Sequence, residues 1–181
     1  MKLAYLSFIT SLVLSSCGNS TAHYNKQPVS LGENTNEIRV ATPANFDTSY
    51  IAEDAGLSFC EAKLKSVFYA KVDSTDRLVV SSPLHFDSEK CTYINTEIDD
   101  SFLGQLVQYY RVKNIKADVN GEIIMIDEKP CVFISIQNAE GKIDQAILKT
   151  FLDGRMVEVQ YQSSVFNAEQ AKELFAQMEW V

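Results

Sequence analysis

The feature that most constrains the fold is a series of short β-rich segments separated by turn signals in the second half of the chain. Asn120-Gly121, 138–141 and Asp153-Gly154 carry residue types that favour tight turns. Between these turns lie four β-rich runs, at residues 115–119, 122–126, 131–137 and 144–152. A fifth run, 157–161, alternates apolar and polar residues, so one side of this strand is expected to be buried. The pattern predicts an antiparallel meander.

Two segments outside these runs predict helices. Asp99 and Asp100 are cap-type residues before an apolar pattern with spacings of three and four, which predicts a helix over 100–112. Asn167 is expected to cap a second helix, with Gln170 at the capping-box position. Its apolar stripe is Ala171, Leu174, Phe175 and Met178. We therefore expect a single α+β domain, in which helices pack on one or both faces of an antiparallel β-sheet.

The first half of the chain gives weaker signals. Residues 38–41 form a strand candidate before Pro43, and the runs 66–72 and 77–81 are predicted to pair as a hairpin. Residues 53–63 fit either a short helix or the start of a strand. The segment 83–97 has mostly loop chemistry.

The order of elements in residues 99–181 resembles a known fold. A helix is followed by strands, a turn at Asp127 to Pro130 leads into the run 131–134, Gly154-Arg155 begins the last strand, and a helical segment ends the chain. This order is similar to the C-terminal half of the PsbP-like fold, which photosystem accessory proteins share with small bacterial lipoproteins of the DcrB type. The resemblance covers under half of the chain and implies a fold far more than a function.

The N-terminus carries a processing signal. Lys2, a short apolar run and small residues before position 17 predict a secretory signal peptide over 1–16, too short to span a bilayer comfortably. Leu14-Ser15-Ser16-Cys17 resembles the bacterial lipobox. The resemblance implies cleavage before Cys17, a diacylglyceryl group on its sulfur and an acyl chain on its amine. Several acyl chains would hold the protein in a membrane, facing the periplasm.

The residue after the lipobox cysteine bears on the membrane. Position 18 is Gly rather than the Asp that resembles an inner-membrane retention signal, which favours the outer membrane if the host is Gram-negative. Residues 17–36 are polar and contain Gly and Pro, so we expect a lipidated cysteine and a flexible tether there. The single domain is then expected over 37–181.

Composition excludes some classes of partner. The net charge is −8, and removal of Lys2 with the signal peptide makes it one unit more negative. Such a charge argues against nucleic-acid binding and favours a basic protein partner.

Cysteine usage fits an oxidising compartment. With Cys17 lipidated, Cys60, Cys91 and Cys131 remain, an odd number that predicts one disulfide and one buried thiol. Sequence spacing leaves all three pairings open, and we favour Cys60 with Cys91.

No catalytic or metal-binding motif emerges from the sequence. His85 lies near Ser81, Ser82 and Asp87 in the sequence. No G-x-S-x-G motif surrounds either serine, so we expect His85 to be an exposed loop histidine. The pairs Asp99-Asp100 and Asp127-Glu128 do not have the spacing of a calcium loop and are expected to be a helix N-terminus and a turn. We therefore predict no metal, no cofactor and no enzymatic activity.

These observations favour a non-enzymatic protein-binding lipoprotein, such as an immunity protein against a basic toxin or an envelope accessory protein. The predicted partner-binding residues are Glu158, Gln160, Gln162, Tyr109 and Tyr110. An alternative is a small-ligand-binding lipoprotein accessory to transport or assembly, with a pocket between sheet and helix. A hydrolase using His85 is a third hypothesis.

Overall fold

The computed structural model describes residues 24–30, 37–43, 46, 48–59, 62–70, 76–83, 97–152, 155–163 and 166–180. The strands and helices in order are β1 (Tyr24–Ser30), β2 (Glu37–Pro43), β3 (Thr48–Phe59), β4 (Ala62–Ala70), β5 (Arg77–Pro83), α1 (Asp100–Lys113), β6 (Asp118–Ile126), β7 (Lys129–Gln137), β8 (Ile143–Leu152), β9 (Arg155–Gln162), α2 (Ala168–Phe175) and β10 (Glu179–Trp180).

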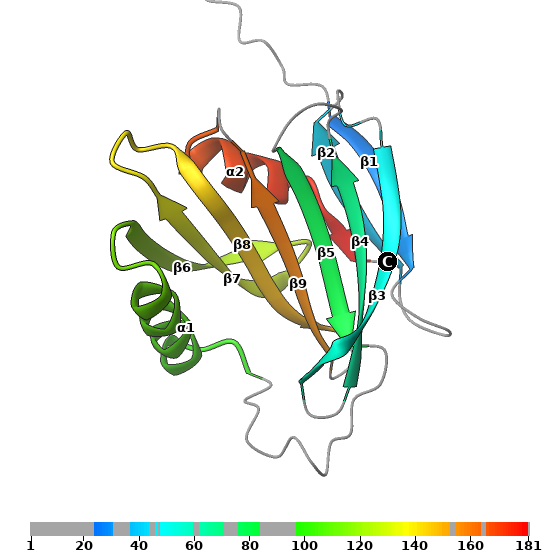
Figure 1. Ribbon diagram of the computed structural model, residues 1–181, viewed down its shortest axis with the longest axis horizontal. Coiled ribbons are helices and arrows are strands. Elements are labelled where there is room, and N and C mark those ends of the chain that lie inside the picture. The colour runs from blue at the N-terminus through cyan, green and yellow to red at the C-terminus, as the bar shows by residue number, and fades with distance from the viewer. Residues whose placement is uncertain are drawn as a thin grey trace, which may run out of the picture.

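The strands form two antiparallel sheets (Figure 1). The large sheet has seven strands in the order β3-β4-β5-β9-β8-β7-β6, and the small sheet has three in the order β1-β2-β10. The predicted meander is present as β6 to β9, and β9 also pairs with β5, which joins the meander to the first half of the chain. The prediction of a single α+β domain is confirmed.

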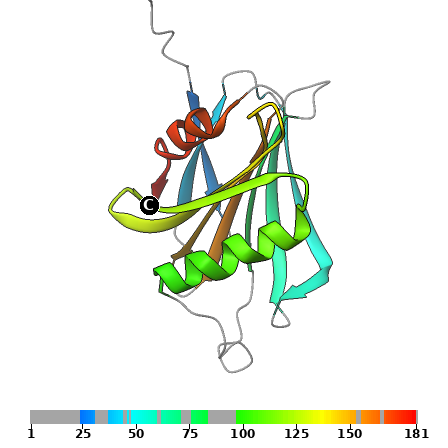
Figure 2. The same cartoon turned by 90° about the vertical axis from the view of Figure 1, so that its left-hand side faces the viewer.

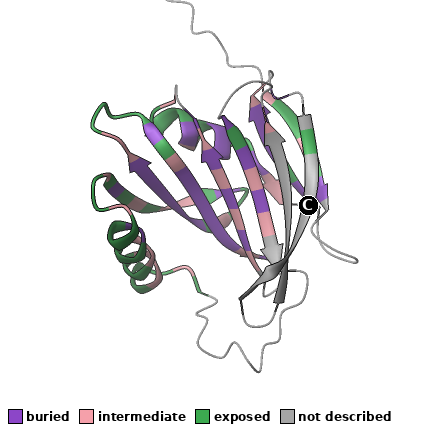
Figure 3. Cartoon of the chain, viewed as in Figure 1, coloured by how far each residue is buried: buried purple, intermediate pink, exposed green. Residues whose placement is uncertain are grey.

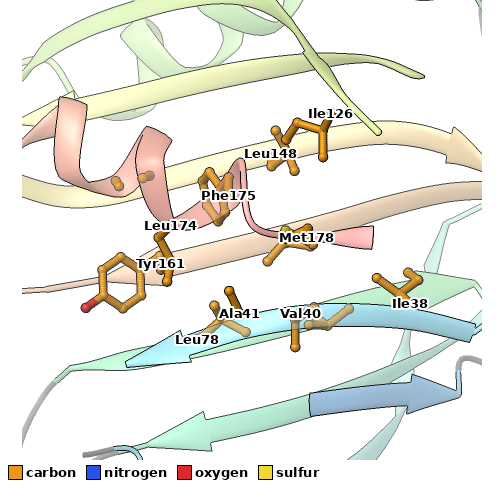
Figure 4. Packing of buried hydrophobic residues seen from close by; sticks show 14 of the residues in the cluster. Ile38, Val40, Ala41, Leu78, Ile126, Leu148, Tyr161, Leu174, Phe175 and Met178 are labelled. Atoms are coloured by element: carbon orange, nitrogen blue, oxygen red, sulfur yellow. The ribbon is translucent and has the colours of Figure 1, made fainter. Parts of the chain in front are cut away.

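One face of the large sheet packs against α2 and the small sheet. Alternate residues of the large sheet, such as Phe133, Leu148 and Val159, belong to this core. Figure 4 shows Phe175 and Met178 between the two sheets, with Leu148 and Tyr161 on one side and Val40 on the other. The predicted stripe of Ala171, Leu174, Phe175 and Met178 is buried, and Asn167 and Gln170 form the predicted capping box. This layer is the main hydrophobic core of the described residues.

The opposite face packs against α1. The residues between those of the main core, including Val132, Ile134 and Ile147, form a second cluster with Tyr110. Phe102, Leu103 and Leu106 of α1 complete it from above, and α1 lies alongside β6 (Figure 2). Because both of their faces are covered, β7 and β8 are almost continuously buried. Asp99 caps α1 as predicted, accepting a hydrogen bond from the Phe102 amide at 2.7 Å.

The turn predicted at Asn120-Gly121 is wrong. Both residues lie within the continuous strand β6, and Gly121 pairs with Ile134 of β7. A Cβ atom on Gly121 would lie 2.6 Å from a methyl carbon of Val107 and 3.0 Å from one of Leu103. The glycine therefore serves the close approach of α1 to the sheet instead of a tight turn.

The flexible tether predicted over residues 17–36 is also wrong in part. Residues 24–30 form strand β1, which pairs with β2 along its whole length and buries Val29. The segment is polar because β1 is an edge strand, where one side faces solvent and Pro28 is tolerated. Backbone pairing and two apolar side chains, Tyr24 and Val29, are enough to hold it on the core.

Several local predictions in the first half and at the turns are confirmed. Strands β4 and β5 form the predicted hairpin, and residues 53–63, ambiguous from sequence, fall largely in β3 and β4. Asp127 and Glu128 form the turn between β6 and β7, with positive φ angles of 46° and 63°. Cys131 is a free, buried thiol, and burial raises its pKa to about 11. Neither of the two helices among the described residues is long and apolar enough to cross a bilayer.

The contact between α1 and β6 gives a stability prediction with a matched control. Gly121→Ala should lower the free energy of unfolding by about 1 to 3 kcal/mol, since the added methyl overpacks the interface with Val107. Gly104→Ala, on the outer side of the same helix, should raise the free energy of unfolding by about 1 kcal/mol, because nothing lies within 4 Å of its Cβ position. Denaturant unfolding of the two variants measures both. Equal effects would contradict the packing role of Gly121.

Candidate partner-binding face

At the centre of the large sheet, its two faces are covered to different extents. On the side that carries α1, the helix packs over β6, β7 and β8, and the side chains that β9 and β5 present there are half-buried or exposed. We call this surface the open face. It consists of Glu158, Gln160 and Gln162 from β9 and Arg77, Val79 and Ser81 from β5.

Strand β9 presents this row because its residues alternate. Val157, Val159 and Tyr161 point into the main core, so the residues between them point to the side of α1. The register with β5 places Gln160 opposite Val79 and Gln162 opposite Arg77. The polar side chains therefore sit on paired strands in the middle of the sheet, where the backbone is fixed by neighbours on both sides.

A buried ion pair lies where α1 stops covering the sheet. Lys149 of β8 is only 7% exposed, and its Nζ lies 2.5 Å from Oε2 of Glu158, its direct cross-strand neighbour. The other carboxylate oxygen, Oε1, accepts a hydrogen bond from Nε2 of Gln160 at 2.5 Å. The Glu158 side chain is thus held from both sides, and its position on the open face is fixed.

The electrostatics favour a charged Lys149. Burial alone would lower the pKa of this ammonium group, but the Glu158 carboxylate and the Tyr110 hydroxyl outweigh burial and raise the pKa. The ammonium also lies 5.7 Å from the centroid of the Tyr110 ring. Burial raises the pKa of Tyr110, so this phenol is neutral beside the charged pair.

Two of the predicted partner-binding residues are brought to this ion pair, and a third lies next to them on β9. Glu158 and Gln160 contact each other, and Gln162 follows on the same side of the strand. The structure places all three on the same side of β9, and their contact with a partner stays a prediction.

The prediction for the tyrosines needs a correction. Tyr110 is only 8% exposed and belongs to the cluster beneath α1, because its position on the helix points toward the sheet. Its ring lies beside the Lys149 ammonium, and it does not offer a surface for a partner. Tyr109 is 49% exposed on the outer side of α1, with its ring edge-on to Tyr110 at 5.1 Å between centroids.

Lys149 was not predicted as part of the site, although the sequence contains a signal for it. A two-residue connection between β8 and β9 pairs Leu152 with Arg155, and counting back along both strands brings Lys149 opposite Glu158. A lone lysine in a mostly apolar run, facing a carboxylate across a hairpin, indicates a buried pair.

The carboxylates considered as metal ligands have structural roles. Asp99 caps α1, and Asp127 accepts a hydrogen bond from the backbone amide of Trp180 at 3.0 Å. Among the described residues, no group of three or more His, Cys, Asp or Glu side chains is arranged to hold a metal ion. Cys17, Cys60, Cys91 and His85 lie outside the described residues, so their predicted roles remain predictions.

A second surface feature lies on the outer side of α1. It is a shallow, open, mainly apolar hollow above Gly104, lined by Gly104, Gln105, Gln108, Tyr109, Val112 and Lys113. Figure 3 shows that much of α1 is exposed to solvent. The hollow is separate from the open face, which lies on the sheet.

Comparison of the chain with models of protein families, with curated proteins and with solved structures finds no match. The resemblances to lipoproteins and to the PsbP-like fold therefore remain predictions from the sequence.

The buried pair gives a second stability prediction. Glu158→Leu alone should lower the free energy of unfolding by about 3 kcal/mol, since it leaves the buried Lys149 ammonium without its carboxylate. The double variant Lys149→Met/Glu158→Leu should recover to within about 1 kcal/mol of the parent, because no uncompensated charge is left. Thermal or denaturant unfolding checks both variants.

The exposed pair of Lys142 with Glu140, at 3.8 Å, supplies the control. Glu140→Leu should change stability by no more than about 0.5 kcal/mol, because solvent already screens this pair. If the Glu158→Leu variant were as stable as this control variant, the ion pair of Lys149 with Glu158 would not organise the open face.

Proposed function

We propose that the protein is a membrane-anchored lipoprotein of the bacterial cell envelope whose domain is a non-enzymatic protein-binding module. In this proposal Cys17 carries the lipid, the domain faces the periplasm, and the outer membrane is its location in a Gram-negative host. The open face is the surface that contacts the partner. An immunity protein or an envelope accessory protein would act in this way.

The observation that carries the proposal is the half-buried polar row of Glu158, Gln160 and Gln162 on rigid, paired strands. Protein interfaces bury polar and apolar groups together, and groups that are already positioned lose little conformational freedom on binding. Glu158 is positioned by Lys149 and Gln160, so a partner would meet a preorganised carboxylate.

The charge of the chain supports a basic partner. The net charge of −8 steers basic proteins toward the domain and increases the rate of association at low salt. The open face itself carries one cation, Arg77 opposite Gln162, and one carboxylate, Glu158 opposite Ser81, so its charges are nearly balanced and specificity would come from paired hydrogen bonds.

A protein partner fits the described surfaces better than a small ligand does. Small-ligand sites enclose most of the ligand in a concave pocket. The hollow on α1 is shallow and open, and the open face belongs to a sheet surface. Both therefore favour contact with a larger molecule.

Affinity capture with surface variants tests the proposed face. The whole chain should capture a basic envelope protein at low salt and less of it at moderate salt, as charge screening requires. Gln160→Arg/Gln162→Arg should reduce this capture at least about tenfold, because two bulky cations would disrupt the centre of the contact. Gln177→Arg, an exposed change after α2, should leave it unchanged. Loss of capture in both variants, or in neither, would contradict the assignment of the open face.

The lipid anchor is tested separately at Cys17. Cys17→Ser should remove the acyl mass from the N-terminal peptide and release the protein from the membrane fraction, because the thiol is the site of diacylglyceryl transfer. Cys131→Ser should keep both, since the thiol of Cys131 is buried in the core. Mass spectrometry and fractionation give the answer, and an unmodified Cys17 in the parent chain would refute the anchor.

A further inference from the structure

The end of α1 exposes large apolar side chains that the fold does not use. Tyr109 is 49% exposed, Val112 is 65% exposed, and Ile115, just beyond the helix, is 88% exposed. Tyr109 and Val112 are one turn apart, so they lie on the same side of the helix. They line the outer hollow, in contrast to the side of α1 that packs on β6.

Positive charge surrounds these apolar side chains. Residues 109–116 contain Arg111, Lys113 and Lys116 and no acidic residue, although the whole chain carries a charge of −8. All three cations are exposed. Cations near a helix C-terminus are favoured by the helix dipole, but the dipole does not account for an exposed valine and isoleucine between them.

The side chains have the arrangement of an interfacial contact. Lys113 lies with its Nζ 4.3 Å from the centroid of the Tyr109 ring and donates a hydrogen bond to the Tyr109 hydroxyl. Arg111 donates to the Val119 carbonyl from Nε at 3.3 Å and from one terminal nitrogen at 3.2 Å, which fixes this end of α1 to β6. Aromatic and aliphatic groups beside basic side chains are the combination that inserts shallowly into a membrane surface with anionic headgroups.

The start of β1 limits how far the domain could stand from a membrane. Strand β1 begins at Tyr24, so only seven peptide units separate it from Cys17. Even a fully extended chain of this length spans no more than about 25 Å. An anchor at Cys17 would therefore keep the domain near the lipid headgroups, where anionic lipid would attract the basic residues at the end of α1.

We propose that Tyr109, Val112 and Ile115, with Arg111, Lys113 and Lys116, form a membrane-contact surface that binds anionic lipid headgroups and orients the anchored domain. We call it the α1 tip. This inference rests on the lipid anchor of the proposed function, and it specifies how the domain lies on the membrane. The open face belongs to the sheet and is distinct from the α1 tip.

Lysine labelling of the chain as the cell processes it tests the inference. The purified protein is reconstituted with vesicles of phosphatidylcholine alone, or of phosphatidylcholine mixed with phosphatidylglycerol, and treated with a water-soluble acylating reagent. Peptide mass spectrometry then compares Lys116 with Lys142, an exposed lysine at the turn between β7 and β8. We expect Lys116 to be labelled at least about threefold more slowly on the anionic vesicles and Lys142 to be labelled equally on both.

Two matched variants sharpen the result. Ile115→Glu should abolish the protection of Lys116, because it replaces the most exposed large apolar side chain of the described residues with a charge of the same sign as the lipid. Met125→Glu, at an apolar residue that is 63% exposed on β6, should retain the protection.

The same spectra separate failure of this inference from failure of the proposed anchor. Equal labelling of Lys116 on the two kinds of vesicle overturns the inference, whether or not Cys17 carries lipid. Protection in intact envelopes combined with equal labelling on protein-free vesicles would assign the α1 tip to a protein partner and would also overturn it. Protection of Lys116 with an unmodified Cys17 would support the membrane contact and refute the anchor.

Discussion

The arrangement of the large sheet depends on how each of its faces is covered. The face that carries α2 and the small sheet is closed by one continuous core, in which Phe175 and Met178 lie between Leu148 and Val40 (Figure 4). On the other face, α1 is the only helix that the described part of the chain places above the sheet, and it covers β6, β7 and β8. Where that cover ends, the side chains change from Val132 and Ile134 to the polar row of β9. The ion pair of Lys149 with Glu158 lies at this boundary, because a lysine there is enclosed by the helix on one side and needs a carboxylate on the other. One covering helix thus determines both the second core and the position of the candidate site.

Much of this architecture could be predicted from local patterns. The capping box at Asn167, the cap at Asp99 and the alternation of Val157, Val159 and Tyr161 are determined by neighbouring residues, so the helices and the polar side of β9 were predicted correctly. The turn predicted at Asn120-Gly121 is wrong because Gly121 is required by its close approach to Val107. This contact exists only in the folded chain and cannot be seen in the local sequence. Residues 24–30 were misinterpreted because a polar edge strand gains most of its stability from pairing with β2, and its own composition does not reveal that pairing.

The candidate site shows the same division between local and distant signals. Glu158, Gln160 and Gln162 could be selected from their alternation within one strand. Their organisation depends on Lys149 and Tyr110, which come from β8 and α1 and meet only through the register of β8 with β9 and the packing of α1. The burial of Tyr110 and the exposure of its neighbour Tyr109 likewise depend on which side of α1 faces the sheet. The alternation of residues in the sequence therefore identifies the surface. Tertiary packing decides which of its residues are free to contact a partner.

We propose that the open face contacts a protein in the cell envelope. The most direct measurement is site-specific crosslinking in living cells that make the whole chain, with a photoreactive amino acid at position 160 or, for comparison, at position 177 after α2. We expect one defined adduct from position 160, absent from position 177, because Gln160 lies at the centre of the open face and Gln177 belongs to the opposite layer. No adduct from position 160, or the same adducts from both positions, would contradict it.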